Sequence, residues 1–150
     1  MKWNLGLMAF LISSAIVLGC RKGDPGPAGT ANVFYSDWSN TAPWIASTTS
    51  TGSGKETWYL DIAEPRITQD IVDKGAVLVY AKFVGDPDGD LVKALPSTYY
   101  DNGSTLSQYH FQYAVSPGKV RIICDVMPAG KPANTNQIRY IVIPGGISID

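Results

Sequence analysis

The chain from residue 31 onward alternates short runs of β-branched and aromatic residues with clusters of glycine, proline, asparagine and aspartate. Runs of this kind, bounded by turn residues, predict β-strands. The strongest is "AVLVYAKFV" (76–84), and because both of its faces are largely apolar, we expect it to be central in its sheet. The other predicted strands are 31–38, 56–63, 91–95, 106–115, 119–126 and 138–144.

The run 106–115 shows the alternation most clearly. Tyr109, Phe111 and Tyr113 fall on one face of a strand there, and His110 falls on the other, which we expect to be the solvent face. Several short strands separated by turns are typical of a sandwich or a barrel. We predict an all-β fold, an antiparallel β-sandwich that is Ig-like or a similar Greek key, with about seven to eight short strands.

One segment, "PRITQDIVDKG" (65–75), does not show the alternation that is typical of a strand. Ile67 and Ile71 are four residues apart, Thr68 can cap a helix, and Gly75 can end one. The pattern therefore predicts a short helical turn near 67–74, crossing an end of the sandwich.

The chain begins with one early positive charge and an uncharged apolar run of fifteen residues, Leu5–Gly19, which stops at Cys20. This run is shorter than the about 20 residues that a membrane-spanning helix needs. Its parts are those of a secretory signal peptide. An ordinary cleaved signal and a short buried helix are the alternatives.

The end of that run, "VLGC" (17–20), resembles a bacterial lipobox. The resemblance implies a signal peptide at 1–19, lipidation of Cys20 and attachment to the membrane through this lipid. By analogy with known sorting signals, Arg21 in place of an aspartate favours the outer membrane. Two or more acyl chains hold a protein stably on a bilayer, so no transmembrane helix is needed.

A collagen-like stub, "GDPGPAG" (23–29), follows the cysteine. It is too short for a triple helix, because three chains must be ordered together over many Gly-X-Y repeats. Proline and glycine favour an extended backbone here. We therefore expect a spacer at 20–30 that lifts one domain, 31–150, off the bilayer.

Charge and cysteine content limit the kinds of partner and of disulfide that we expect. Without Lys2, the chain has eleven basic and thirteen acidic residues. It has no basic patch of the kind that binds nucleic acid. If Cys20 carries lipid, Cys124 has no partner for a disulfide. Cys124 lies between apolar residues in "VRIICDV", so we expect a buried thiol that packs as a small hydrophobic group.

Asp86, Asp88 and Asp90 lie at alternate positions in "GDPDGDL", like the start of a calcium-binding EF-hand loop. The sixth position of such a loop is glycine and the twelfth is glutamate, but Leu91 and Ser97 stand there. Pro-Asp-Gly sequences are also common turns. We expect a turn, with the three aspartates as weak candidates for a metal site.

Exposed aromatic rings on a β-surface could bind a carbohydrate. The candidate residues are Trp38, Trp44, Tyr99 and Tyr100. Aromatic residues are also ordinary members of strands and cores. The loops 39–55 and 97–105, which hold or adjoin these rings, are the predicted binding surface.

The sequence offers little for catalysis. It has a single histidine and lacks the HExxH, GxSxG and CxxC motifs, so we expect no enzyme and no cofactor. Asp61 and Glu64 could act as a carboxylate pair in a glycosidase, but their spacing in the sequence says nothing of the separation that this chemistry needs.

Three pieces of the chain resemble small lipoproteins of Bacteroidota-type bacteria. They are the lipobox with "GDPGPAGTANV" behind it, the block "ITQDIVDKGAVLVYAKF" and the ending "IRYIVIPGG". The resemblance implies a surface- or periplasm-facing lipoprotein with a β-rich domain, and it brings no site residues. We expect a non-catalytic structural or interaction module, or alternatively a carbohydrate-binding accessory lipoprotein. An exposed sheet edge at 138–144 could recruit a partner strand.

Overall fold

The computed structural model describes residues 32–52, 54–89, 91–101 and 106–146. The predicted signal peptide, Cys20 and the spacer lie outside these residues, as does Asp90. All described residues belong to one compact unit of the chain. Within them, no helix is long and apolar enough to cross a membrane.

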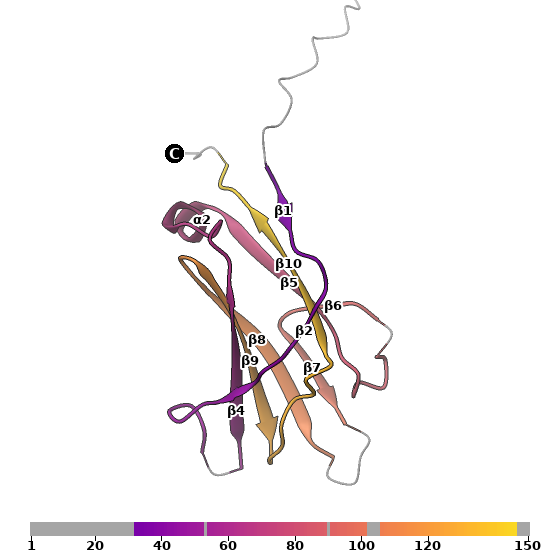
Figure 1. Cartoon of the computed structure of the whole chain (residues 1–150). Coiled ribbons are helices and arrows are strands. Elements are labelled where there is room, and N and C mark those ends of the chain that lie inside the picture. The colour runs from indigo at the N-terminus through magenta and orange to yellow at the C-terminus, as the bar shows by residue number, and fades with distance from the viewer. Residues whose placement is uncertain (1–31, 53, 90, 102–105, 147–150) are drawn as a thin grey trace, which may run out of the picture. The chain divides into compact units, whose positions relative to one another are not determined.

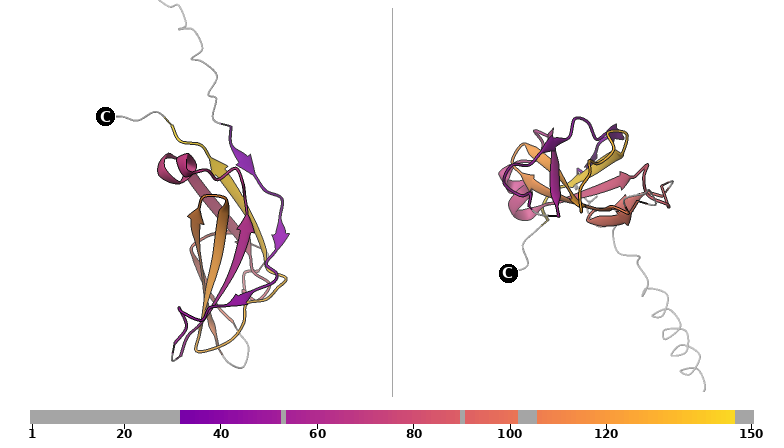
Figure 2. Two further views of the ribbon diagram at one scale, coloured as in Figure 1. Left: turned by 60° about the vertical axis from the view of Figure 1, so that its left-hand side comes forward. Right: turned by 90° about the horizontal axis from the view of Figure 1, so that it is seen from below.

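The described residues form two five-stranded antiparallel sheets. The sheets face each other as the two layers of a β-sandwich (Figures 1 and 2). Sheet A has the strand order β1-β10-β5-β6, with β2 also paired to β10, and sheet B has the order β3-β4-β9-β8-β7. The predicted all-β sandwich is therefore confirmed. The strands are β1 (Phe34–Tyr35), β2 (Ser39–Asn40), β3 (Ile45–Ala46), β4 (Glu56–Ala63), β5 (Ala76–Lys82), β6 (Lys93–Ala94), β7 (Ser97–Tyr100), β8 (Gln108–Ser116), β9 (Lys119–Met127) and β10 (Gln137–Ile143).

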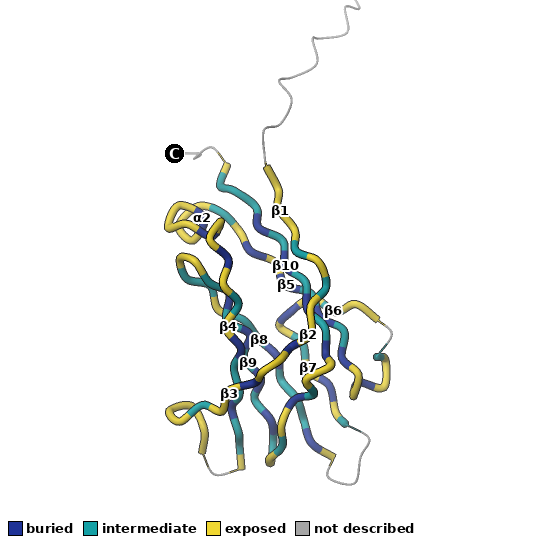
Figure 3. Tube along the Cα trace, viewed as in Figure 1, coloured by how far each residue is buried: buried dark blue, intermediate teal, exposed yellow. Residues whose placement is uncertain are grey.

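The long strands lie close to their predicted bounds because their side chains alternate between core and surface. In β9 every second side chain, from Val120 to Val126, is buried (Figure 3). The predicted strand at 31–38 is wrong in its bounds. Two separate two-residue strands, β1 and β2, pair with different parts of β10. Between them, the Ser36 backbone N–H donates to the Tyr140 carbonyl oxygen, and the Tyr140 backbone N–H donates to the Ser36 hydroxyl oxygen.

The helical turn is confirmed as α2 (Gln69–Lys74), whose first turn is capped by the Thr68 side chain. Ile71 of α2 and the preceding Ile67 are buried at one end of the core. Gly75 ends the helix where the chain turns into β5. A Cβ atom at Gly75 would lie 2.5 Å from the Ile143 carbonyl oxygen, so only glycine fits this approach.

The core between the sheets is built around a cluster of aromatic rings. Phe83 and Phe111 are almost fully buried, with ring centroids 4.4 Å apart. Trp44 meets Phe111 edge-on, and Tyr99 stacks on Tyr109. The inward face of β8 therefore carries the aromatic residues that its alternation predicts, and these rings fix the spacing of the two sheets.

Candidate functional site

Sheet A presents an unusually apolar outer surface. Its inward side chains on β5 and β10, such as Val79 and Ile138, are buried, so the alternate positions face outward. We define outer face A as the outward positions of β1, β5 and β10: Tyr35, Ala76, Leu78, Tyr80, Lys82, Gln137, Arg139, Ile141 and Ile143.

Strand pairing places the apolar members of outer face A in a continuous row. Tyr35 is opposite Ile141, and Ile141 is opposite Leu78 on the next strand. Tyr35 is 70% exposed and Leu78 is 40% exposed. We expected 76–84 to be central in its sheet because both of its faces are apolar. This prediction is confirmed, since β5 has neighbouring strands on both sides, but its second face is open to solvent.

The outer surface of sheet B, on the opposite side of the sandwich, is more polar. The outward positions of sheet B hold mostly polar and charged side chains, including Asp61, Arg121, Asp125, His110 and Gln112. His110 lies there as predicted, with its Nδ1 atom 2.8 Å from the Thr98 hydroxyl oxygen. An antiparallel sheet with a polar outer face is the ordinary arrangement, so outer face A is the exception.

Two cations lie at one end of outer face A. Arg139 lies near two rings, with its guanidinium carbon 5.3 Å from the centre of Trp38 and 5.7 Å from that of Tyr80. Lys82 places its Nζ atom 4.6 Å from the centre of the same Trp38 ring. These are cation–π distances.

A hollow of about 310 Å³ adjoins this cationic end. Lys82 and Gln137 of outer face A contribute to its wall. The full lining is Lys82, Phe83, Val84, Gly89, Thr135 and Gln137. The row of apolar side chains, the two ring-bound cations and this hollow form one continuous candidate site.

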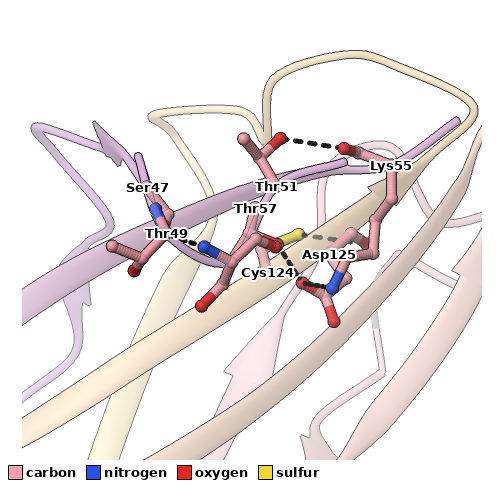
Figure 4. A network of polar contacts seen from close by, with 8 residues as sticks. Ser47, Thr49, Thr51, Lys55, Thr57, Cys124 and Asp125 are labelled. Carbon is pink, nitrogen blue, oxygen red and sulfur yellow. Dashed lines mark hydrogen bonds and ion pairs between the residues drawn. The ribbon is translucent and has the colours of Figure 1, made fainter. Parts of the chain in front are cut away.

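A second hollow, of about 400 Å³, lies on the outer surface of sheet B under the loop from Ile45 to Ser50. Figure 4 shows the polar contacts that tie this loop down. The Thr57 hydroxyl lies 2.6 Å from the Ser50 carbonyl oxygen and 2.5 Å from Asp125, while Lys55 pairs with Asp125. These contacts account for the loop's position.

The four aromatic residues predicted to bind a ligand are not brought together. Trp44 and Tyr99 are each only 5% exposed, because both rings pack against Phe111 in the core. Tyr100 is 61% exposed on β7 in sheet B, whereas Trp38 lies beside the cations of sheet A. Placing Trp44 and Tyr99 on an exposed binding surface was therefore wrong.

The aspartates of the 85–89 turn already have a cationic neighbour. Lys93 forms an ion pair with Asp86, and its Nζ atom lies 3.7 Å from Asp88. Asp86 also accepts a hydrogen bond from the Asp88 backbone N–H, as an aspartate that organises a turn does.

Cys124 is fully buried, and this burial raises the pKa of its thiol.

Asp61 and Glu64 take part in separate ion pairs. Asp61 lies on the outer surface of sheet B and receives two hydrogen bonds from Arg121. Glu64 is buried, and its carboxylate receives hydrogen bonds from Arg66 and from the Tyr140 hydroxyl. The Arg66 hydrogen bonds lower the pKa of Glu64 to about 2 despite the opposing effect of burial.

The expected free edge at 138–144 is also wrong, because β10 has β5 on one side and β1 and β2 on the other. Sequence reasoning did not identify outer face A. The apolar second face of 76–84 was visible in the sequence, but we took it only as a sign that this strand is central in its sheet. A comparison of the chain with family models, curated proteins and solved structures found no match.

Proposed function

We propose that this protein is a non-catalytic lipoprotein of the cell envelope, anchored in the outer membrane through Cys20, and that its β-sandwich binds a partner protein through outer face A. The observation that carries the binding role is the apolar row of Tyr35, Ile141 and Leu78, in which Tyr35 and Leu78 are exposed and Ile141 is half-buried. Contiguous exposed apolar surface is typical of interaction sites. Tryptophan, tyrosine and arginine, which surround this row, are the residues enriched at protein interfaces.

The anchor rests on the sequence "VLGC" and on the apolar run before it. Metabolic labelling with a fatty acid tests it, comparing the wild type with Cys20→Ala. We expect label on a chain that begins at Cys20 and none on the variant. A soluble mature chain with a free Cys20 thiol would refute the anchor, and the pairing of Cys20 with Cys124 would then have to be reconsidered.

Protein binding accounts for the surface better than carbohydrate binding does. The carbohydrate alternative needs several rings on one surface, and burial of Trp44 and Tyr99 leaves the two other candidates on different sheets. Outer face A offers a broad, mainly apolar surface instead.

Site-specific photo-crosslinking in cells tests the binding surface. A crosslinking residue replaces Leu78 on outer face A, and in a matched chain it replaces Gln112, which faces outward on sheet B. We expect one defined protein adduct at position 78, none at position 112, and loss of the adduct when Tyr35→Asp is added. Tyr100→Asp is the control for that change, because Tyr100 is similarly exposed on the other sheet. Absence of an adduct at position 78, or equal adducts at both positions, would contradict the proposal.

A further inference from the structure

Within the part of the chain that the structure describes, the two cations of outer face A have no anionic partner. No carboxylate of these residues lies within 4 Å of Arg139 or Lys82, and neither cation makes a hydrogen bond with them. Asp37 precedes Trp38 in the sequence and forms no ion pair with either cation. Two like charges beside one ring create a local positive potential that a bound anion would neutralise.

Arg139 is held in place rather than free in solvent. Its Nε atom is buried and has no hydrogen-bond partner among the described residues, although the residue as a whole is only partly buried. A buried polar atom without a partner is rare in folded proteins. The rings of Trp38 and Tyr80 therefore fix a guanidinium group whose terminal N–H groups remain free to donate, so little side-chain entropy is lost when it binds a ligand.

An arginine on sheet B, Arg121, can be compared directly with Arg139. Arg121 also lies over an aromatic ring, with its guanidinium carbon 4.3 Å from the centre of Tyr59. It donates two hydrogen bonds to Asp61, at 2.6 and 2.7 Å. An arginine beside a ring thus has a bidentate carboxylate partner on sheet B, whereas Arg139 on sheet A has no such partner among the described residues.

Charge on outer face A also distinguishes between possible partners. None of its outward strand positions is acidic, so the same face of a second copy would offer no carboxylate to Arg139. An anionic membrane would attract the two cations, but two basic side chains give only weak binding to a charged surface. The guanidinium group of Arg139, which lies near two rings, can make directional hydrogen bonds to one carboxylate. This geometry favours a single carboxylate over a diffuse layer of surface charge as its ligand.

From these contacts we infer that outer face A binds a protein segment in which an aspartate or glutamate stands beside apolar side chains, and that Arg139 receives its carboxylate. The apolar side chains lie against the Tyr35–Ile141–Leu78 row, and the hollow beside Lys82 adjoins the carboxylate. This inference rests on the proposed function, because it names the chemistry of the partner that the same face binds.

A displayed library of random peptides, selected on the purified full chain in a non-ionic detergent, tests the inference. We expect the selected peptides to combine apolar residues with aspartate or glutamate. Affinities are then measured for each peptide and for its counterpart with asparagine or glutamine in place of the acid. Charge-assisted hydrogen bonds of ordinary strength predict an affinity about tenfold to a hundredfold lower for the amide peptide.

The same affinities are measured for Arg139→Gln and for Arg139→Lys, with Arg121→Gln as the matched control on sheet B. Arg139→Gln should lower affinity as much as the amide peptide does, and the two changes together should cause no further loss. Arg139→Lys keeps the positive charge but loses the planar guanidinium group, which can donate two hydrogen bonds to one carboxylate. The affinity of this variant for the acidic peptide should therefore lie between those of the wild type and Arg139→Gln. Arg121→Gln should leave binding unchanged. Replacing the acid of the peptide by its amide cannot unfold the protein. A loss of affinity on that change therefore reports on the contact with the carboxylate and not on the stability of the fold.

Three results would overturn the inference. Equal binding of acidic and amide peptides, lost with Tyr35→Asp, would show an apolar partner and leave the proposed function standing. Binding to phosphatidylglycerol vesicles that depends on Arg139, with no peptide selected, would make the face a membrane surface. Absence of both peptide and vesicle binding would remove the carboxylate role, and crosslinking at position 78 would then decide whether the proposed function also fails.

Discussion

The buried ion pair of Glu64 supports a quantitative prediction about stability. The Glu64 side chain is 3% exposed, and Arg66 donates to both of its oxygens, at 2.7 and 2.8 Å. The Tyr140 hydroxyl donates a further bond of 2.6 Å from β10. Glu64 thus joins the end of β4 to sheet A, and we predict that Glu64→Gln weakens this connection.

The magnitude follows from the pKa of the carboxyl group. Arg66 hydrogen bonds, followed by that of Tyr140, lower the pKa of Glu64 from 4.5 to about 2 in the folded protein. At about 1.4 kcal/mol per pKa unit, the ionised carboxylate stabilises the fold by about 3 kcal/mol at neutral pH. Arg66 is about half exposed, and solvent screens part of this attraction. We therefore expect Glu64→Gln to lower the free energy of unfolding by about 2 kcal/mol.

The pH dependence has a definite sign. Because the pKa of Glu64 is lower in the folded state, the unfolded chain binds a proton first as the pH falls. The stabilisation is complete above about pH 5 and is lost progressively towards about pH 2. The difference in stability between the wild type and Glu64→Gln should therefore shrink with acid.

Urea unfolding followed by circular dichroism, at neutral pH and through this acid range, measures the effect. Asp61→Asn is the matched control, because Asp61 pairs with arginine on the surface, where such pairs are worth less than about 1 kcal/mol. A Glu64→Gln variant within about 0.5 kcal/mol of the wild type, with the same acid dependence, would refute the reasoning.

Three further predictions concern the core, the thiol and the aspartate turn. Phe111→Ala should lower the free energy of unfolding by about 3 to 5 kcal/mol, because it empties the centre of the aromatic cluster; a loss below about 1 kcal/mol in urea unfolding would contradict this packing. Burial raises the pKa of the Cys124 thiol, so a maleimide should label it only in unfolded protein, and rapid native labelling detected by mass spectrometry would disagree. Added calcium should leave the melting temperature unchanged, since Lys93 pairs with Asp86; a rise that Asp88→Ala abolishes would count against this.

Much of the fold could be predicted from local patterns. Alternation located β8 and β9 to within about two residues, because a half-buried strand must place every second side chain in the core. Thr68 and Gly75 marked the limits of α2, since capping depends on neighbours in the sequence. The pairing of β1 and β2 with β10 was beyond such reasoning, because it joins segments about a hundred residues apart.

The candidate site was harder to predict than the fold. Burial of Trp44 and Tyr99 depends on the Phe111 ring, which comes from another strand of the sheet. The sequence alone determined that 76–84 carries apolar side chains on both faces, because residue type and the period of two fix this. Only the tertiary structure decided that one of those faces is open to solvent, and that Arg139 lies near two rings with no carboxylate of the described residues beside it. Exposure and charge pairing depend on which distant strands pack together, and no local pattern specifies that.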